Sequence, residues 1–469
     1  MANSKSTQTM SRNLEFKDVL VLAFSTMIGW GWVALTGKWV NQGGAVGAVL
    51  AFVIGAVLCI FVGLTYCELT PALPYSGGEL VFSYKAMGYH GAWFSGWMIA
   101  FAYIGVAAWE GPALVTAIDY LIKIPRYGYL WTIAGFDVYV TWLLIPVFAG
   151  TLLCIINIKG IKISSMFQAA VTIILAVGGI IFAVISGTHG SVGHMKPLFS
   201  STKGMFTVVL SVPAMFVGFD VIPQVAEEMN LPLKKIPRAI VSSILLAAAW
   251  YIMIILASSF AAPKEVLGKE GLSVVHAVNY ATNHPVAGKL IVVTAIMGIL
   301  SSWNGFIIGA TRVLYSMGRA KMLPDFFGEL HRKYQTPRNA ILFIGIITIL
   351  TPLLGKNSLG WFVDASAFGT VIAYFMVALS FVILRRTCKD LPRPFKVKHG
   401  MLVGVIAILI SLFFISLYLP IGSSSLSGIE WMIVGVWVCF GLILYFISLP
   451  HMRKNTQIRE KALFCKFSD

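Results

Sequence analysis

Residues 25–34 read STMIGWGWVA, and this stretch lies inside the first long apolar run of the chain. A membrane-spanning helix ordinarily keeps its backbone hydrogen bonds within itself, because lipid offers no replacement partner. Here Gly29 and Gly31 interrupt the run on either side of Trp30. Glycine disfavours the helical conformation, so we expect the helix to break at this point. The backbone groups freed by the break then need a ligand, an ion or water.

The composition of the 469-residue chain is typical of a membrane protein, with 58% hydrophobic and 12% charged residues. A soluble fold cannot bury that much apolar surface. Long apolar runs recur along nearly the whole chain, and many approach the roughly 20 residues needed to cross a bilayer. We therefore predict an all-α polytopic membrane protein with twelve transmembrane helices. The predicted spans are residues 18–39, 45–70, 92–121, 136–157, 162–187, 206–229, 239–261, 287–316, 339–354, 360–385, 401–419 and 427–449.

The sixth predicted span carries a second interruption, in the stretch GFDVIPQVAEE of residues 218–228. The first and sixth spans each open a set of five, and breaks at corresponding places are typical of transporters built as inverted repeats. The alternative is that the glycines only allow close helix packing. The predicted organisation is a cytoplasmic N-terminal segment, a first five-helix repeat, a second repeat with its preceding outer loop, an inner loop with the last two helices, and a cytoplasmic tail. These parts cover residues 1–17, 18–187, 188–385, 386–449 and 450–469.

The net charge of +16 comes from 35 Lys and Arg residues against 19 Asp and Glu. Most of the basic residues fall in loops on one side of the predicted spans, which predicts that both termini are cytoplasmic. They are dispersed over many loops, which favours contact with anionic lipids over nucleic-acid binding. The clearest basic clusters contain Arg332, Lys333 and Arg338, and then Arg385, Arg386, Lys389, Arg393, Lys396 and Lys398.

Neither cysteine nor histidine is arranged for a structural metal site. The six cysteines form no CxxC pair, and the eight histidines fall in or near predicted loops. We therefore expect no disulfide framework, no histidine-based zinc site and no cofactor.

Three stretches resemble the amino acid–polyamine–organocation superfamily of permeases: residues 66–97, which begin YCELTPALPYSGGE; residues 218–240, GFDVIPQVAEEMNLPLKKIPRAI; and residues 310–324, ATRVLYSMGRAKMLP. The resemblance implies twelve helices, a five-plus-five inverted repeat with broken helices 1 and 6, and transport by alternating access. In similar proteins a small residue stands between the two glycines of helix 1, where backbone amides hold a substrate carboxylate. Trp30 stands at that position here, and its indole would fill part of the space.

Glu110 is the strongest candidate for a substrate-binding side chain. It lies well inside the span 92–121, where a charged residue costs at least about 2.5–3.5 kcal/mol. It either balances a substrate ammonium group, carries a proton, or is a structural carboxyl satisfied by neighbouring helices. The predicted substrate-binding residues are Ile28, Gly29, Trp30, Gly31, Ala107, Glu110, Phe216, Gly218, Phe219 and Asp220.

Two acidic groups on the sixth span have competing explanations. For Asp220, the resemblance supports a gating or ligand role, whereas the residue also suits the capping of backbone N–H groups freed by the break. We expect Glu227 and Glu228 to pair with inner-loop cations such as Arg238.

A sodium site is predicted from the hydroxyl pair Ser301 and Ser302 in the span 287–316. In sodium-coupled transporters of the fold that the resemblance implies, such a pair binds the ion together with carbonyl oxygens of helix 1. The predicted ligands are the carbonyls of Ser25, Ile28 and Gly298 and the hydroxyls of Ser301 and Ser302. Several proton-coupled relatives place a lysine from helix 5 there, but Leu175 stands at the matching position. Alternatively, the serines bond only to their own helix.

These features predict a secondary active transporter of the plasma membrane that takes up a small amino acid or a related amine, driven by an ion gradient. The alternatives are a carrier for an organic amine or quaternary ammonium, an antiporter exchanging an amino acid for its amine, and a transporter-like sensor. No nucleophile–base pair supports an enzyme. The choice between sodium and proton coupling and the oligomeric state stay open.

Overall fold

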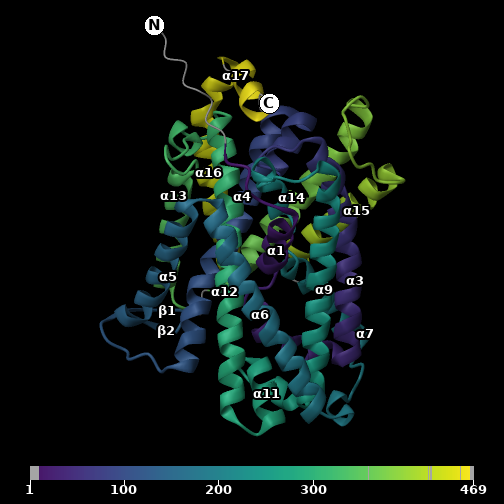
Figure 1. Cartoon of the computed structure of the whole chain (residues 1–469), viewed down its shortest axis with the longest axis vertical. Coiled ribbons are helices and arrows are strands. Elements are labelled where there is room, and N and C mark those ends of the chain that lie inside the picture. Colours follow the sequence, from purple (N-terminus) through teal and green to yellow (C-terminus); the bar gives the residue numbers. More distant parts are fainter. Residues whose placement is uncertain (1–9, 357–358, 421, 423–424, 455, 465–469) are drawn as a thin grey trace.

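The computed structural model describes residues 10–356, 359–420, 422, 425–454 and 456–464, and within them the chain is almost entirely helical (Figure 1). Ten helical segments in this part of the chain are long and apolar enough to cross a membrane, which supports a polytopic membrane fold. The long helices are α3 (Thr36–Ala72), α4 (Glu79–Leu121), α5 (Val140–Lys159), α6 (Ile161–His189), α9 (Ile236–Ala261), α12 (Pro285–Arg319), α14 (Leu359–Thr387), α15 (Gly400–Tyr418) and α16 (Gly428–Lys454).

The first predicted break is present. Helix α1 (Phe16–Met27) ends before the two glycines, and the short helix α2 (Gly31–Ala34) begins at the second of them. The sixth predicted span is interrupted in the same way, because α7 (Thr202–Met215) stops well before α8 (Val221–Gln224). Both interruptions therefore lie where glycine predicted them.

The two breaks touch each other through Gly218. This residue has φ of +139°, a backbone conformation that residues with a side chain rarely adopt. An alanine Cβ at this position would lie 2.9 Å from the backbone nitrogen of Met27 and 3.1 Å from the carbonyl carbon of Thr26. Gly218 thus lets the interrupted part of one helix pack directly on the interrupted part of the other.

Glycine also divides two of the longest helices. Gly44, with φ of +75°, separates the end of the predicted span 18–39 from the start of the span 45–70 within α3. Gly88, with φ of +71°, separates the first turns of α4 from the part that covers the predicted span 92–121. The predicted boundaries fall at these kinks.

The all-α prediction needs one correction, because residues 136–139 form a strand rather than the start of a helix. Strands β1 (Tyr129–Ile133) and β2 (Phe136–Tyr139) form an antiparallel hairpin, and α5 begins only at Val140. The turn residues Ala134 and Gly135 both have positive φ, +49° and +73°. This turn geometry favours a tight hairpin, and the strands are rich in aromatic and β-branched residues.

The remaining elements are short and connect or cap the long helices. Residues 262–284 contain α10 (Lys264–Leu267) and α11 (Ser273–Thr282), and α13 (Arg338–Leu350) with the 3₁₀ helix η5 (Thr351–Leu354) covers the predicted span 339–354. The other 3₁₀ helices are η1 (Val192–Met195), η2 (Ala226–Glu228), η3 (Leu233–Lys235) and η4 (Asp325–Gly328).

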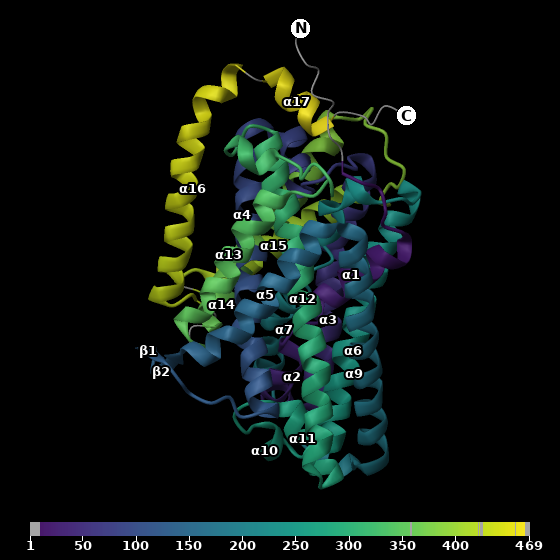
Figure 2. The ribbon, with the colours of Figure 1, turned by 60° about the vertical axis from the view of Figure 1, so that its left-hand side comes forward.

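Both described chain ends lie at one end of the helix bundle (Figure 1). The tail forms the helix α17 (Thr456–Phe464), which follows α16 and returns across this end (Figure 2). It is held there by Arg459, whose Nε donates to the carbonyl of Ala320 at 3.1 Å.

Two ion pairs lie at the same end of the bundle, one buried and one partly exposed on its arginine. Glu227 pairs with Arg319 at 2.6 Å, and Glu228 pairs with Arg312 at 2.9 Å. The predicted partner Arg238 is therefore wrong, because the two acids pair with arginines of α12 rather than with Arg238 at the start of α9. Leu14, in the segment before α1, forms an isolated parallel β-bridge with Met229. The segment therefore packs next to the ion-paired residues Glu227 and Glu228.

Candidate functional site

A cavity of about 70 Å³ lies at the break between α1 and α2. Its wall is completed by side chains from α4, α7, α9, α12 and α14. Space of this size holds a few water molecules or a small polar group. Five of the predicted site residues line it: Gly29, Trp30, Gly31, Glu110 and Ser302.

Glu110 brings a carboxyl group into this cavity from α4. The residue is 1% exposed, and its Oε2 has no hydrogen-bond partner in the described part of the chain. Trp30 and Trp109 also line the cavity, while none of its described lining residues is Lys, Arg or His. An unpaired buried carboxylate beside aromatic rings favours a positively charged ligand group.

Gly29 allows the Glu110 carboxyl group to approach the broken helix. An alanine Cβ at this position would lie 2.7 Å from Oε1 of Glu110 and 2.9 Å from Oγ of Ser302. Both distances are shorter than an ordinary contact, so the two side chains occupy the space that the missing Cβ leaves. The break therefore supplies both free backbone groups and room for an acidic side chain.

Two polar residues of the cavity wall that were not predicted, Tyr251 and Thr26, form hydrogen bonds with α1. The hydroxyl of Tyr251, on α9, donates to the carbonyl of Met27 at 2.9 Å and so satisfies a group freed at the end of α1. Thr26 also lines the cavity, although its hydroxyl bonds back to Leu22. The signal for Tyr251 was a phenol in the middle of an apolar span, which needs a polar partner.

Six predicted substrate-binding residues lie outside the cavity wall: Ile28, Ala107, Phe216, Gly218, Phe219 and Asp220. Their side chains are buried in the surrounding core. Phe219 packs edge-on against Tyr66 with the ring centroids 5.4 Å apart, and Phe216 lies 6.1 Å from Tyr251. Phe216 thus packs behind Tyr251 of the cavity wall, whereas Phe219 packs against Tyr66, which does not line the cavity.

The side chain of Asp220 binds a backbone N–H group in the interruption between α7 and α8. Its Oδ1 accepts a hydrogen bond from the N–H of Gly218 at 2.7 Å, and its Oδ2 has no partner among the described residues. The observed bond is the capping arrangement that sequence reasoning left open beside a ligand role.

Most of the predicted sodium ligands lie together behind the cavity. Oγ of Ser301 lies 2.8 Å from the carbonyl oxygen of Gly298 and 3.2 Å from that of Ser25. The carbonyl oxygen of Ile28 lies beside Gly298. An alanine Cβ at residue 298 would lie 2.9 Å from this oxygen. Ser302, by contrast, faces the cavity. Carbonyl and hydroxyl oxygens are the hard donors that a sodium ion prefers.

A glutamine on α6 is part of this arrangement and was missed. Gln168 is buried, and its Nε2 donates to Oγ of Ser25 at 2.6 Å and to the carbonyl of Ser301 at 2.8 Å. Its Oε1 accepts from Asn304 at 2.6 Å. A polar residue in the span 162–187 was visible in the sequence, but its partners on other helices were not.

A larger recess of about 460 Å³ adjoins the cavity. The two share five lining residues, Leu35, Trp109, Ala214, Met215 and Val363. Asp364 and Glu430 also line the recess, with Lys38 as the one basic side chain among its described lining residues. The cavity is thus adjacent to a polar recess, and the ion pairs of Glu227 and Glu228 lie outside its wall.

Comparison with known proteins agrees with the membrane fold. The amino acid permease family model matches residues 14–448. The branched-chain amino acid permease BcaP of Bacillus subtilis is 25% identical, and its methylthioribose transporter is 26% identical, each over 97% of both chains. The glutamate/serine transporter AimA of the same organism is 27% identical over 83% of this chain and 74% of its own.

The family match covers nearly the whole chain, from the segment before the first break to the end of the last long helix. Its relatives are permeases and transporters of small molecules, and none of those compared above is named for catalysis. The chain therefore belongs to the amino acid permease family, within the amino acid–polyamine–organocation superfamily.

Proposed function

We propose that this protein is a secondary active transporter of the plasma membrane that takes up a small amino acid or a related amine. The observation that carries the proposal is the cavity at the α1–α2 break, with the unpaired Oε2 of Glu110 in its wall. The relatives differ in the substrates for which they are named. The substrate of this chain is therefore argued from its own cavity.

The cavity selects a ligand by charge and by size. Glu110 balances an ammonium group, and the face of Trp30 attracts the same group by about 2 kcal/mol or more when both are dehydrated. The small volume, together with the indole between the two glycines, excludes long side chains. An amine or quaternary ammonium without a carboxylate is the second candidate, because none of the described cavity residues is basic.

Transport proceeds by alternating access, in which the site opens in turn to each side of the membrane. The moving parts are two five-helix repeats, residues 18–187 and 188–385, within a set of twelve spans. The polar recess lies on the outer side in this proposal, and the substrate enters through it. The ion pairs of Glu227 and Glu228 with α12 keep the cytoplasmic end closed. Both termini are cytoplasmic, and release requires these pairs to separate.

Sodium is the proposed coupling ion. The carbonyls of Ser25, Ile28 and Gly298 and the hydroxyl of Ser301 support this choice, because they converge behind the cavity. Leu175 offers no proton-carrying amine from α6. A bound ion holds α1 and α12 together across the break, so sodium binding favours the state that accepts substrate.

A thermal-shift screen of the purified full chain tests the proposal. The panel contains alanine, serine, leucine and lysine, their decarboxylated amines, and glycine betaine, each in sodium and in potassium chloride. Ligands that bind only the folded state raise its stability. We expect stabilisation by one small ligand, larger in sodium, and uptake of that ligand by proteoliposomes. Uptake that is abolished by a protonophore but unchanged when potassium replaces sodium would overturn the sodium assignment.

A further inference from the structure

A second cavity with a basic lining lies at the beginning of α15, apart from the substrate site. Its volume is about 710 Å³, and Arg385, Lys396 and Lys398 line it together with the first residues of the helix. Among its described lining residues, none is acidic. A cavity with several cations and no acid attracts an anion, so the feature differs in kind from the acidic cavity around Glu110.

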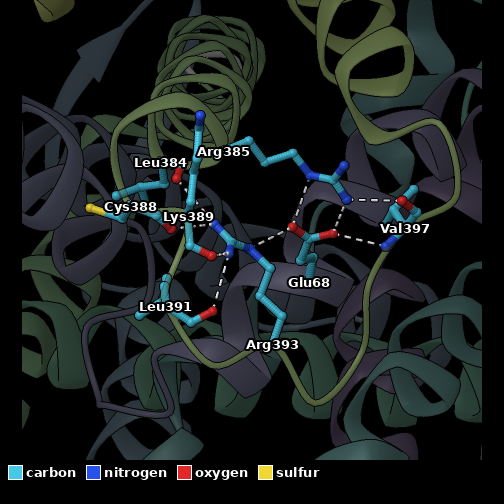
Figure 3. A network of polar contacts seen from close by, with 8 residues as sticks. All are labelled: Glu68, Leu384, Arg385, Cys388, Lys389, Leu391, Arg393 and Val397. Carbon is cyan, nitrogen blue, oxygen red and sulfur yellow. Dashed lines mark hydrogen bonds and ion pairs between the residues drawn. The ribbon is translucent and has the colours of Figure 1, made fainter.

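A buried network shapes this basic cavity (Figure 3). Glu68 on α3 is fully buried and forms ion pairs with Arg385 and Arg393. It also accepts from the N–H of Val397 at 2.8 Å, while Arg385 donates to the Val397 carbonyl at 2.9 Å. The one carboxylate therefore binds two guanidinium groups and fixes the chain at Val397.

This anchoring orients the two neighbouring lysines outward. Val397 is buried and faces Glu68, whereas Lys396 and Lys398 are exposed. Neither lysine has an ion-pair partner within the described residues. With two arginines against one glutamate, the network beneath them leaves one positive charge uncompensated. The charges of the cavity are thus held in place by the fold and remain available to a ligand.

The backbone adds further donors on the same wall. Gly400 begins α15, and an alanine Cβ there would lie 2.0 Å from Cζ of Arg385, so the guanidinium packs directly against the helix start. The first N–H groups of a helix have no carbonyl partner within that helix and favour an anion. Lysine, arginine and helix N–H groups together are the donors that recognise phosphate.

An apolar strip continues from the cavity along α15. Leu402 lines the cavity, and Val405 and Leu409 follow on the same helix face at 62%, 42% and 60% exposure respectively. Spacings of three and four residues place the three side chains in one row. In a membrane-spanning helix such a row faces acyl chains. A ligand that places an anionic head in the cavity and a hydrocarbon chain on this row fits both surfaces.

We propose that the cavity at the start of α15 is a binding site for the phosphate headgroup of an anionic membrane phospholipid. Lys396 and Lys398 contact the phosphate, Arg385 supports it from below, and Leu402 begins the acyl-chain surface. The site is independent of the transported substrate. It ties the lipid to α3 through Glu68 and to α14 through Arg385.

The test measures lipid-specific stabilisation of the full chain in nanodiscs. Nanodiscs of phosphatidylcholine alone are compared with nanodiscs that contain one-fifth phosphatidylglycerol, for the unmodified protein and for Lys396→Gln/Lys398→Gln. The control is Lys234→Gln/Lys235→Gln, which removes two exposed lysines at the same end of the bundle. Native mass spectrometry counts the phosphatidylglycerol molecules that remain bound. Inorganic phosphate at millimolar concentration forms a separate arm in phosphatidylcholine.

We expect phosphatidylglycerol to raise the melting temperature of the unmodified protein and of the control. A basic residue near a membrane surface changes affinity for anionic lipid about fivefold, so the Lys396/Lys398 variant should bind phosphatidylglycerol at least tenfold more weakly. Equal lipid retention and equal stabilisation in both variants would overturn the site. Stabilisation by inorganic phosphate that matches that of phosphatidylglycerol would overturn the assignment to a lipid.

Discussion

Adding one methyl group at Gly29 is the sharpest test of the substrate site. In Gly29→Ala, the new Cβ lies 2.7 Å from Oε1 of Glu110, about 0.7 Å inside ordinary contact distance. The backbone of Gly29 does not have positive φ, so alanine fits the local conformation without strain. The change therefore acts mainly on the side chains that face it, which are Glu110 and Ser302.

The expected loss of transport follows from this displacement. The Glu110 carboxyl group must move by roughly 0.7 Å, and misplacing a functional group by about 1 Å reduces activity as much as 100-fold. We expect uptake by Gly29→Ala to fall about tenfold. Overpacking of a buried position also destabilises a protein by about 1–3 kcal/mol, so uptake is normalised to folded protein measured by size-exclusion chromatography.

A double-mutant cycle separates the carboxylate from a general packing defect. Glu110→Asp withdraws the carboxyl group by one methylene, so adding Gly29→Ala to it should reduce uptake less than threefold. Gly187→Ala is the control, because the added Cβ has no atom within 4 Å apart from its chain neighbours and the backbone of its own helix. The assay is initial uptake into proteoliposomes of the panel ligand that stabilises the protein most. An equal reduction in both backgrounds would refute the contact between Gly29 and Glu110 as the cause.

The remaining predictions concern the charge, the aromatic wall, the ion and the closed end. Glu110→Gln should lower uptake at least 100-fold while leaving the elution profile unchanged, and near-normal uptake would make Glu110 structural. Trp30→Ser should admit larger amino acids and weaken amine binding, measured by competition; an unchanged ranking of competitors would exclude Trp30 from selection. Ser301→Ala should abolish the extra stabilisation in sodium over potassium, and retention of that difference would move the ion elsewhere. Arg312→Gln leaves Glu228 buried without its partner, so thermal unfolding should reveal a loss of about 3–5 kcal/mol; unchanged stability would contradict the role of this pair.

The breaks were predictable from the sequence because glycines occur at corresponding places in the first and sixth predicted spans. Glycine alone does not break a helix, since Gly179 lies inside α6, but α1 ends before Gly29 and α7 ends before Gly218. The strand at residues 136–139 was not predicted, because an apolar aromatic run suits a strand and a membrane helix equally well. Only the Ala134–Gly135 turn identifies it, and its positive φ values are a property of the fold.

The partners of charged residues were not predictable in the same way. Both acids of residues 227 and 228 were expected to find cations, but the choice of Arg312 and Arg319 over Arg238 depends on how α12 packs against η2. Likewise, Gln168 was one polar residue in an apolar span until packing placed it against Ser25 and Ser301. Sequence patterns predict that a buried polar group has a partner, whereas the tertiary fold decides which one.

The electrostatic balance of the cavity follows from this same packing. A broken helix offers substrate the partial positive charge of its next segment, equivalent to about half an elementary charge for a long helix. Helix α2 has only four residues, so its contribution is smaller. An ionised Glu110 at the break carries a full negative charge, and none of the described lining residues is basic. The cavity is then net negative, so it binds the ammonium end of a ligand more strongly than the carboxylate end. A decarboxylated amine should therefore compete at least as well as the amino acid from which it derives.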